Sequence, residues 1–249
     1  MFDLIALDAD DTLWDNEIYY TQAKLEFIKL LAPYHPDAAW IEQHLDEIEE
    51  ANVSFYGYGI KSFNLSMLQA AIEISAGQIP ASELDAILSL GREMLARTVR
   101  LFPHTVEVLE KLSPTENLML LTKGDIFEQT LKIRRTGLQD YFRLIEIVGE
   151  KTVDTYRLLL ERHRLEPSRF LMVGNSLKSD ILPVLELGGA AVYIPYEMTW
   201  VHEMRVDASH AISQAAARNG YHQLEHLGQL PSLVEWLNSN QMYWELPGE

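Results

Sequence analysis

Polar side chains come at the ends of four short apolar runs of the sequence or a few residues after them, and their types are those that metal-assisted chemistry needs. They comprise carboxylates, an amide, hydroxyls and one ammonium: Asp8, Asp10, Thr122, Lys151, Asn175, Ser176 and Asp180. Carboxylate and amide oxygens are the ligands that a hard divalent cation prefers, and Mg²⁺ is the first expectation. A hydroxyl and an ammonium beside such a cation would suit a phosphoryl group. The set therefore predicts a site for a metal ion and an anionic substrate.

Each of these residues has an ordinary structural explanation when it is taken alone. Asp8 and Asp10 could begin a calcium-binding loop, but that loop requires Gly and an acid where Leu13 and Tyr19 stand. Thr122 could simply cap the helix that follows it. Only the joint occurrence of the set, with each member at the end of an apolar run, makes these separate explanations insufficient.

The hydrophobic pattern predicts the elements that must bring these residues together. Strands are expected at 2–7, 117–121, 144–148, 170–173, 190–194 and 221–224, and helices at 126–136, 152–163, 179–187 and 230–237. Strands that alternate with helices indicate βαβ units and a parallel sheet. In such sheets ligands bind beyond the carboxyl ends of the strands, which is where the polar set lies.

A purely helical pattern separates the first strand from the others. Amphipathic segments punctuated by Pro and Gly predict helices at 19–31, 38–52, 64–75 and 82–98, while the stretch 53–60 is ambiguous. We therefore expect an α/β fold with a Rossmann-like, doubly wound parallel sheet. Its core domain would comprise residues 1–16 and 101–249. An inserted all-helical domain, residues 17–100, would lie over the strand ends as a lid.

In these motifs the sequence resembles the haloacid dehalogenase (HAD) superfamily. Residues 8–12, Asp-Ala-Asp-Asp-Thr, match its D-x-D-x-T first motif, and Thr122 and Lys151 match the second and third. Residues 174–180 match the fourth motif, except that Asn175 stands where Asp is usual. The helical insert resembles the C1 cap of the family. The resemblance covers nearly the whole chain.

The resemblance implies a Mg²⁺-dependent phosphomonoesterase that acts on a small phosphorylated metabolite. Asp8 would attack phosphorus to form an aspartyl-phosphate, and Asp10 would act first as general acid and then as general base. Thr122 would donate a hydrogen bond to a phosphoryl oxygen, and Lys151 would neutralise charge and restrain Asp8. The implied metal ligands are the Asp8 carboxylate, the Asp10 backbone carbonyl, Asn175 and Asp180.

The insert is expected to select the substrate. Residues 55–61, Phe-Tyr-Gly-Tyr-Gly-Ile-Lys, could form a mobile loop in which Tyr56 and Tyr58 contact the substrate and Lys61 meets an anionic group. The alternative is a plain helix–helix connection whose aromatic side chains fill the core of the insert. Lys123 is a further candidate for substrate contact, although alternation along the strand should turn it away from the side of Thr122.

Three other functions remain open at this point. A phosphomutase would use the same residues. The dehalogenases of the superfamily lack the second acid of the first motif, which this chain has as Asp10. A non-catalytic HAD-fold binding protein is favoured only by Asn175, and the retention of the other motif residues opposes it.

Charge and composition limit the partners. The 20 Lys and Arg against 37 Asp and Glu give a net charge of −17, which disfavours nucleic acid and anionic membranes as partners. The absence of cysteine excludes disulfides and thiolate catalysis. No signal-peptide pattern occurs at the first residues, and no apolar run reaches the ~18 residues of a membrane span. We expect a cytoplasmic protein, either a monomer or a homodimer.

Overall fold

The structure is a computed structural model that describes residues 2–197, 212–213 and 220–240. The chain divides into two compact units. The first, which we call the sheet unit, comprises Met1–Asp15, Val99–Lys123 and Ile133–Glu249. The second, which we call the helical unit, comprises Asn16–Thr98 and Gly124–Lys132.

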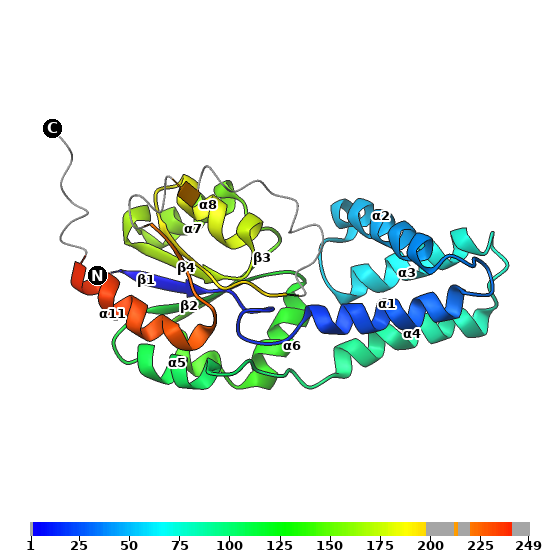
Figure 1. The fold of residues 1–249 in the computed structure, drawn as a ribbon, viewed down its shortest axis with the longest axis horizontal. Helices are drawn as coiled ribbons and strands as arrows, with labels where there is room; N and C mark the ends of the chain where they lie inside the picture. Colours follow the sequence, from blue (N-terminus) through cyan, green and yellow to red (C-terminus); the bar gives the residue numbers. More distant parts are fainter. Residues whose placement is uncertain (1, 198–211, 214–219, 241–249) are drawn as a thin grey trace. The chain divides into compact units, whose positions relative to one another are not determined.

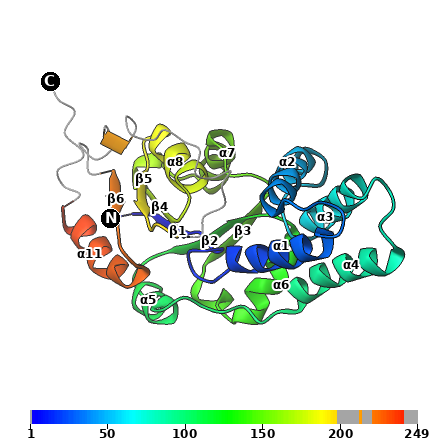
Figure 2. The same cartoon turned by 45° about the vertical axis from the view of Figure 1, so that its right-hand side comes forward.

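The sheet unit is built on a six-stranded parallel sheet in the order β3-β2-β1-β4-β5-β6. Figure 1 labels β1 to β4, and Figure 2 labels β5 and β6 as well. Its strands are β1 (Leu4–Leu7), β2 (Leu118–Lys123), β3 (Leu144–Val148), β4 (Phe170–Gly174), β5 (Ala190–Tyr193) and β6 (Tyr221–Gln223). Every residue of β1 is buried, as expected for a central strand that is covered on both faces. Leu7 pairs with Leu120 on one side and with Val173 on the other, so the ends of β1, β2 and β4 lie at the same edge. The predicted parallel sheet is confirmed.

Helices cover both faces of this sheet (Figure 2). Alternate residues of each strand face opposite sides, and because both sets are apolar, both faces have to be buried. Ile5 and Leu7 face α5 (Thr105–Leu112), the end of α6 (Ile126–Thr136) and α11 (Leu230–Asn240). Leu4 and Ala6 face α7 (Val153–His163) and α8 (Leu182–Glu186). Short turns of 3₁₀ helix occur at Gln139–Tyr141, Pro167–Arg169 and Leu227–Gln229. The predicted helix at 179–187 is instead a π-helical turn, Leu177–Ile181, followed by α8.

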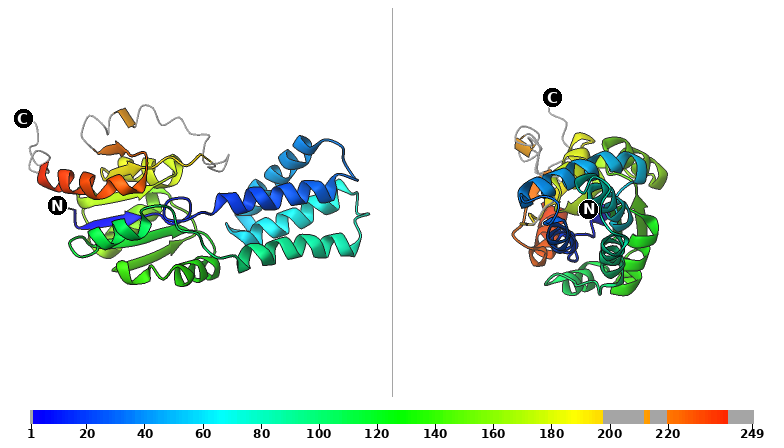
Figure 3. Two further views of the ribbon diagram at one scale, coloured as in Figure 1. Left: turned by 60° about the horizontal axis from the view of Figure 1, so that its bottom comes forward. Right: turned by 90° about the vertical axis from the view of Figure 1, so that its right-hand side faces the viewer.

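The helical unit contains α1 (Glu17–Leu31), α2 (Ala38–Tyr56), α3 (Ile60–Ile74) and α4 (Ala81–Ala96) (Figure 3). α3 packs against α2 and α4, and α1 contacts all three of the others. Their amphipathic faces share a core that includes Phe27, Leu45, Phe63, Met67 and Ile87. The ambiguous stretch 53–60 is the end of α2, a short connection and the first residue of α3. The beginning of α6, up to Lys132, also packs in this unit.

None of the helices in the described ranges has both the length and the apolar character that a bilayer span requires.

Candidate active site

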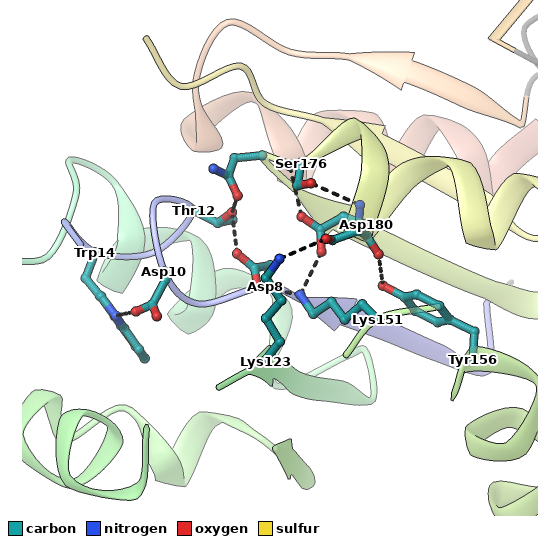
Figure 4. A network of polar contacts seen from close by, with 11 residues as sticks. Asp8, Asp10, Thr12, Trp14, Lys123, Lys151, Tyr156, Ser176 and Asp180 are labelled. Atoms are coloured by element: carbon teal, nitrogen blue, oxygen red, sulfur yellow. Dashed lines mark hydrogen bonds and ion pairs between the residues drawn. The ribbon is translucent and has the colours of Figure 1, made fainter. Parts of the chain in front are cut away.

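Lys151 stands between two carboxylates beyond the carboxyl edge of the sheet (Figure 4). Its Nζ lies 2.5 Å from Asp8 Oδ1 and 2.6 Å from Asp180 Oδ1. All three side chains are almost fully buried. Lys151 is placed by the loop after β3, and α7 begins directly after it with the Thr152 hydroxyl accepting from the Thr155 N–H. When both carboxylates are ionised, this buried group carries one negative charge more than the ammonium offsets.

The Asp8 carboxylate directly follows β1, and its buried surroundings disfavour its charged form unless a positive charge lies beside it. Burial raises the pKa of Asp8 to about 7 because water no longer solvates the charged form, while Lys151 lowers it and the negative charge of Asp180 raises it further. Asp8 Oδ2 accepts from the Thr12 hydroxyl at 3.0 Å, and the same hydroxyl lies 3.4 Å from Asn175 Oδ1. Asn175 therefore lies close to Asp8. A cation bound beside Asp8 would favour its ionised form.

Asp180 is oriented by the π-helical turn and by the strand end before it. Its Oδ2 accepts from the Ser176 N–H at 3.0 Å, and the Ser176 hydroxyl accepts from the Ser179 N–H at 3.0 Å. A Cβ atom added to Gly174 would overlap with the Asp180 carboxylate. The fourth motif therefore needs glycine at 174 because the acid six residues later packs directly on its backbone.

We expect Gly174→Ala to lower the free energy of unfolding by about 1–3 kcal/mol, because the added methyl group must displace a buried, paired carboxylate. Urea denaturation measures this loss. The matched control is Gly149→Ala, since a Cβ there meets nothing within 4 Å. Equal urea midpoints for the two variants would show that the close approach at Gly174 does not constrain the site.

The Asp10 carboxylate is held separately, by Trp14 (Figure 4). The indole Nε1 donates to Asp10 Oδ1 at 2.6 Å, and the Trp14 side chain is fully buried. Between them Asp11 has a left-handed backbone with φ 61°, and its N–H donates to the Trp14 carbonyl at 2.7 Å. This tight loop fixes the orientation of the Asp10 carboxylate by a donor on a rigid, packed ring.

Thr122 and Lys123 are the last residues of β2 and differ in their surroundings. Thr122 is almost fully buried. Lys123 Nζ donates to Ser179 Oγ at 3.1 Å, next to Asp180, and Figure 4 shows the chain of Lys123 running toward this network. The expectation that strand alternation turns Lys123 away is wrong. Its long stem curves at the strand end and carries the ammonium to the site.

In the helical unit, Tyr56, Tyr58 and Lys61 lie around the connection between α2 and α3. Phe55 and Tyr56 are 80% and 56% exposed, so they do not fill the core of the helical unit. Tyr58 is half-buried. Lys61 Nζ is paired with Asp125 Oδ2 at 2.7 Å, and half of its side chain remains exposed. A substrate contact by Tyr56, Tyr58, Lys61 or Lys123 stays a prediction.

Two residues outside the predicted site set, Thr12 and Tyr156, support the site. The hydroxyl of Thr12 bridges Asp8 and Asn175, and the D-x-D-x-T pattern was the signal for it. The buried Tyr156 hydroxyl donates to the Ser179 carbonyl at 3.0 Å, and burial raises the pKa of Tyr156 well above its usual value, so it stays a donor. A tyrosine inside an amphipathic helix carries no sequence signal for that role.

The side-chain donors that the structure brings together for a divalent cation are all oxygens: the carboxylates of Asp8 and Asp180 and the Asn175 amide. The Asp10 backbone carbonyl, a ligand implied by the family resemblance, stays a prediction. Within the described residues no group of three or more His, Asp or Glu side chains could hold a metal ion. A cation here would thus need the amide, the backbone and water in addition to two carboxylates. Mg²⁺ is commonly bound in this manner, through one or two carboxylates with several waters retained. The donor set and its excess negative charge fit Mg²⁺.

Comparison with known proteins relates this chain to one family. A model of haloacid dehalogenase-like hydrolases matches residues 2–188. The crystal structure of a haloacid dehalogenase-like family hydrolase from Xanthomonas campestris superposes with a TM-score of 0.84 at 32% identity, over 98% of this chain and 95% of that one.

Two curated relatives act on phosphate esters according to their names. Pyrimidine 5'-nucleotidase YjjG of Escherichia coli is 28% identical over 131 residues, which are 50% of this chain and 55% of that protein. This match thus spans little more than half of the relative. Glyceraldehyde 3-phosphate phosphatase of Methanocaldococcus jannaschii is 24% identical over 198 residues, 76% of this chain and 83% of that protein.

Proposed function

This chain belongs to the haloacid dehalogenase-like hydrolases, and from that membership we propose that it is a Mg²⁺-dependent phosphomonoesterase for a small phosphorylated metabolite. The observation that carries the proposal is the buried Asp8–Lys151–Asp180 group. A second acid, Asp10, follows Asp8 by two residues and accepts a hydrogen bond from the Trp14 indole. That arrangement supplies a nucleophile, a charge partner and a separate acid. The phosphatase and nucleotidase relatives support the same reaction class.

Asp8 is the proposed nucleophile. Lys151 and Thr12 each donate to one of its oxygens, which fixes the direction in which the carboxylate points. Mg²⁺, held by Asp8, Asp180, Asn175 and the Asp10 backbone carbonyl, would offset the repulsion between the carboxylate and the phosphate and stabilise the charge of the transition state. In the first step an Asp8 oxygen bonds to phosphorus as the bond to the leaving oxygen breaks.

Asp10 is the proposed acid and base. Its protonated carboxyl group donates the proton to the leaving oxygen, which departs as an alcohol. A water molecule then attacks the phosphorus of the aspartyl-phosphate while the Asp10 carboxylate accepts its proton. The products are inorganic phosphate and the free Asp8 carboxylate. Thr122 would donate to a phosphoryl oxygen, and Trp14 would hold Asp10 in the orientation that both steps need.

The same residues distinguish phosphate transfer from carbon–halogen cleavage. A dehalogenase of this family needs no acid to protonate a halide, so the Asp10–Trp14 hydrogen bond favours an oxygen leaving group. A phosphomutase would share the first step but would return the phosphoryl group to a sugar hydroxyl. Release of inorganic phosphate separates the two.

We expect the purified protein to hydrolyse p-nitrophenyl phosphate with Mg²⁺, to lose this activity in EDTA and to regain it when Mg²⁺ is added back in excess. The metal offsets charge that Lys151 alone leaves unbalanced. Initial rates of p-nitrophenol and phosphate release measure this. A panel of nucleoside 5'-monophosphates and sugar phosphates then identifies the preferred ester.

An incubation with 2-chloropropionate, assayed for chloride, is the matched control for the other chemistry. Chloride release without phosphate release would contradict the proposal. Full phosphatase activity in EDTA would contradict its metal dependence.

A further inference from the structure

The first turn of α3 receives its helix cap from a distant part of the chain. The first N–H groups of a helix have no partner within it, and Gly59, the residue before α3, has no side chain to accept from them. Glu128 takes this place. Its Oε2 accepts from the Ile60 N–H at 2.8 Å and its Oε1 from the Lys61 N–H at 3.1 Å, and the side chain is almost fully buried.

Asp125 joins the same two helices through its other contacts. Its Oδ2 pairs with Lys61 Nζ at 2.7 Å, and its Oδ1 accepts from the Glu128 N–H at 3.0 Å at the start of α6. We call the contacts of Asp125 and Glu128 with the beginning of α3 the clasp. Lys132 adds a further tie, because its Nζ donates to Asn16 Oδ1 at 2.8 Å directly before α1.

Gly59 allows the Glu128 carboxylate to come this close. Its φ is +123°, which residues with a side chain rarely adopt. A Cβ there would lie 2.6 Å from Glu128 Oε2 and 3.3 Å from Asp125 Cβ. The connection Gly57-Tyr58-Gly59 is thus held at its α3 end by the contact with Glu128. Any residue other than glycine at position 59 would disturb this contact.

The clasp joins the predicted substrate-selecting residues to the segment that directly follows β2 in the chain. The segment Gly124–Lys132 packs within the helical unit, yet it follows Thr122 and Lys123 of β2 without an intervening loop. One buried and one partly buried hydrogen bond, together with the Lys61–Asp125 ion pair, therefore tie the 57–61 segment to the residues that follow Lys123 in the chain.

We propose that Glu128 and Asp125 are positioning residues that hold the segment 57–61 to the chain following Thr122 and thereby determine which phosphate esters the enzyme accepts. This inference rests on the proposed phosphatase function. Neither residue takes part in bond making. Their effect is on the fit of the leaving group, so it must show as a change in preference between esters.

The test compares Glu128→Ala and Glu128→Gln with Asp37→Ala. Asp37 is a matched control because it caps α2 in the same unit, accepting from the Ala39 and Trp40 N–H groups at 3.0 and 3.2 Å, but at the end remote in sequence from residue 57. For the best ester of the nucleotide and sugar-phosphate panel, Glu128→Ala should raise KM roughly 10- to 100-fold, with p-nitrophenyl phosphate kcat close to wild type. Glu128→Gln, which keeps one acceptor, should lie between.

Amide hydrogen exchange provides a readout that does not need catalysis. Exchange at Ile60 and Lys61 should accelerate in Glu128→Ala and remain as in wild type in Asp37→Ala. An unchanged ratio of kcat/KM values between esters, or equal changes in the Asp37 control, would overturn the inference even if exchange rises. Unchanged exchange would overturn the clasp itself. A wild-type protein that hydrolyses no ester would instead refute the proposed function and, with it, the claim about ester selectivity. Amide exchange at Ile60 and Lys61 would still show whether Glu128 caps α3.

Discussion

Asp8→Asn is expected to abolish hydrolysis of phosphate esters, with a loss of at least about 10⁴-fold in kcat, because an amide cannot form the covalent bond to phosphorus. The substitution keeps the size of the side chain. It also leaves Lys151 paired with Asp180 at 2.6 Å. Initial rates with p-nitrophenyl phosphate, followed to long times, measure the residual activity.

The Asp8 variant should remain folded, and this makes the result interpretable. Burial already raises the pKa of Asp8 to about 7, so a neutral group of the same shape suits the site. The matched control is Asp11→Asn in the same loop, where asparagine tolerates the left-handed backbone. We expect the control to retain most of its activity. Activity of Asp8→Asn near that of the control would place the nucleophile elsewhere.

Lys151→Met should destabilise the protein by about 3–5 kcal/mol, because it leaves two buried carboxylates without their shared cation. Asp8 and Asp180 both lie within 2.6 Å of the ammonium that is removed. Urea denaturation of the variant measures the change in the free energy of unfolding. Phosphatase activity should fall with it, since the orientation of Asp8 depends on the same ammonium.

Two further variants separate a buried ion pair from a general effect of losing a lysine. Lys111 pairs with Glu107 at 2.8 Å on the surface, so Lys111→Met should lower the free energy of unfolding far less than Lys151→Met does. The double variant Lys151→Met/Asp180→Asn should be more stable than Lys151→Met, because one of the two unpaired charges is gone. Equal unfolding free energies for the two single variants would contradict the role assigned to Lys151.

Five of the six strands, β1 to β5, could be predicted because each is built on a short apolar run bounded by polar or glycine residues, whereas β6 is the polar segment Tyr-His-Gln. β3 has the bounds that the pattern indicates, and the others differ by a few residues at their ends. α5 was not foreseen. It has only eight residues, which give a short periodic pattern. His104, directly before it, has a left-handed backbone with φ 70°, so the helix cannot extend toward the N-terminus. α2 extends past the predicted end because nothing stops it before Gly57, with φ 72°.

The candidate site was less predictable than the fold. The order of its motifs identified Asp8, Thr122, Lys151 and Asp180 as residues at strand ends. It could not identify the direction of Lys123 or the donors Trp14 and Tyr156. These depend on where a long or bulky side chain ends, which periodicity does not encode.

The sequence by itself therefore determined the parallel sheet, the helical insert and the types of group at the sheet edge, because local patterns of apolar and polar residues specify elements and their ends. Only the tertiary structure decided the partners. Lys151 meets Asp8 across 143 positions, and Glu128 caps α3 across 68. Such contacts depend on how strands and helices pack and on the rotamer of each side chain. Neither the packing nor the rotamers can be read from the local sequence pattern.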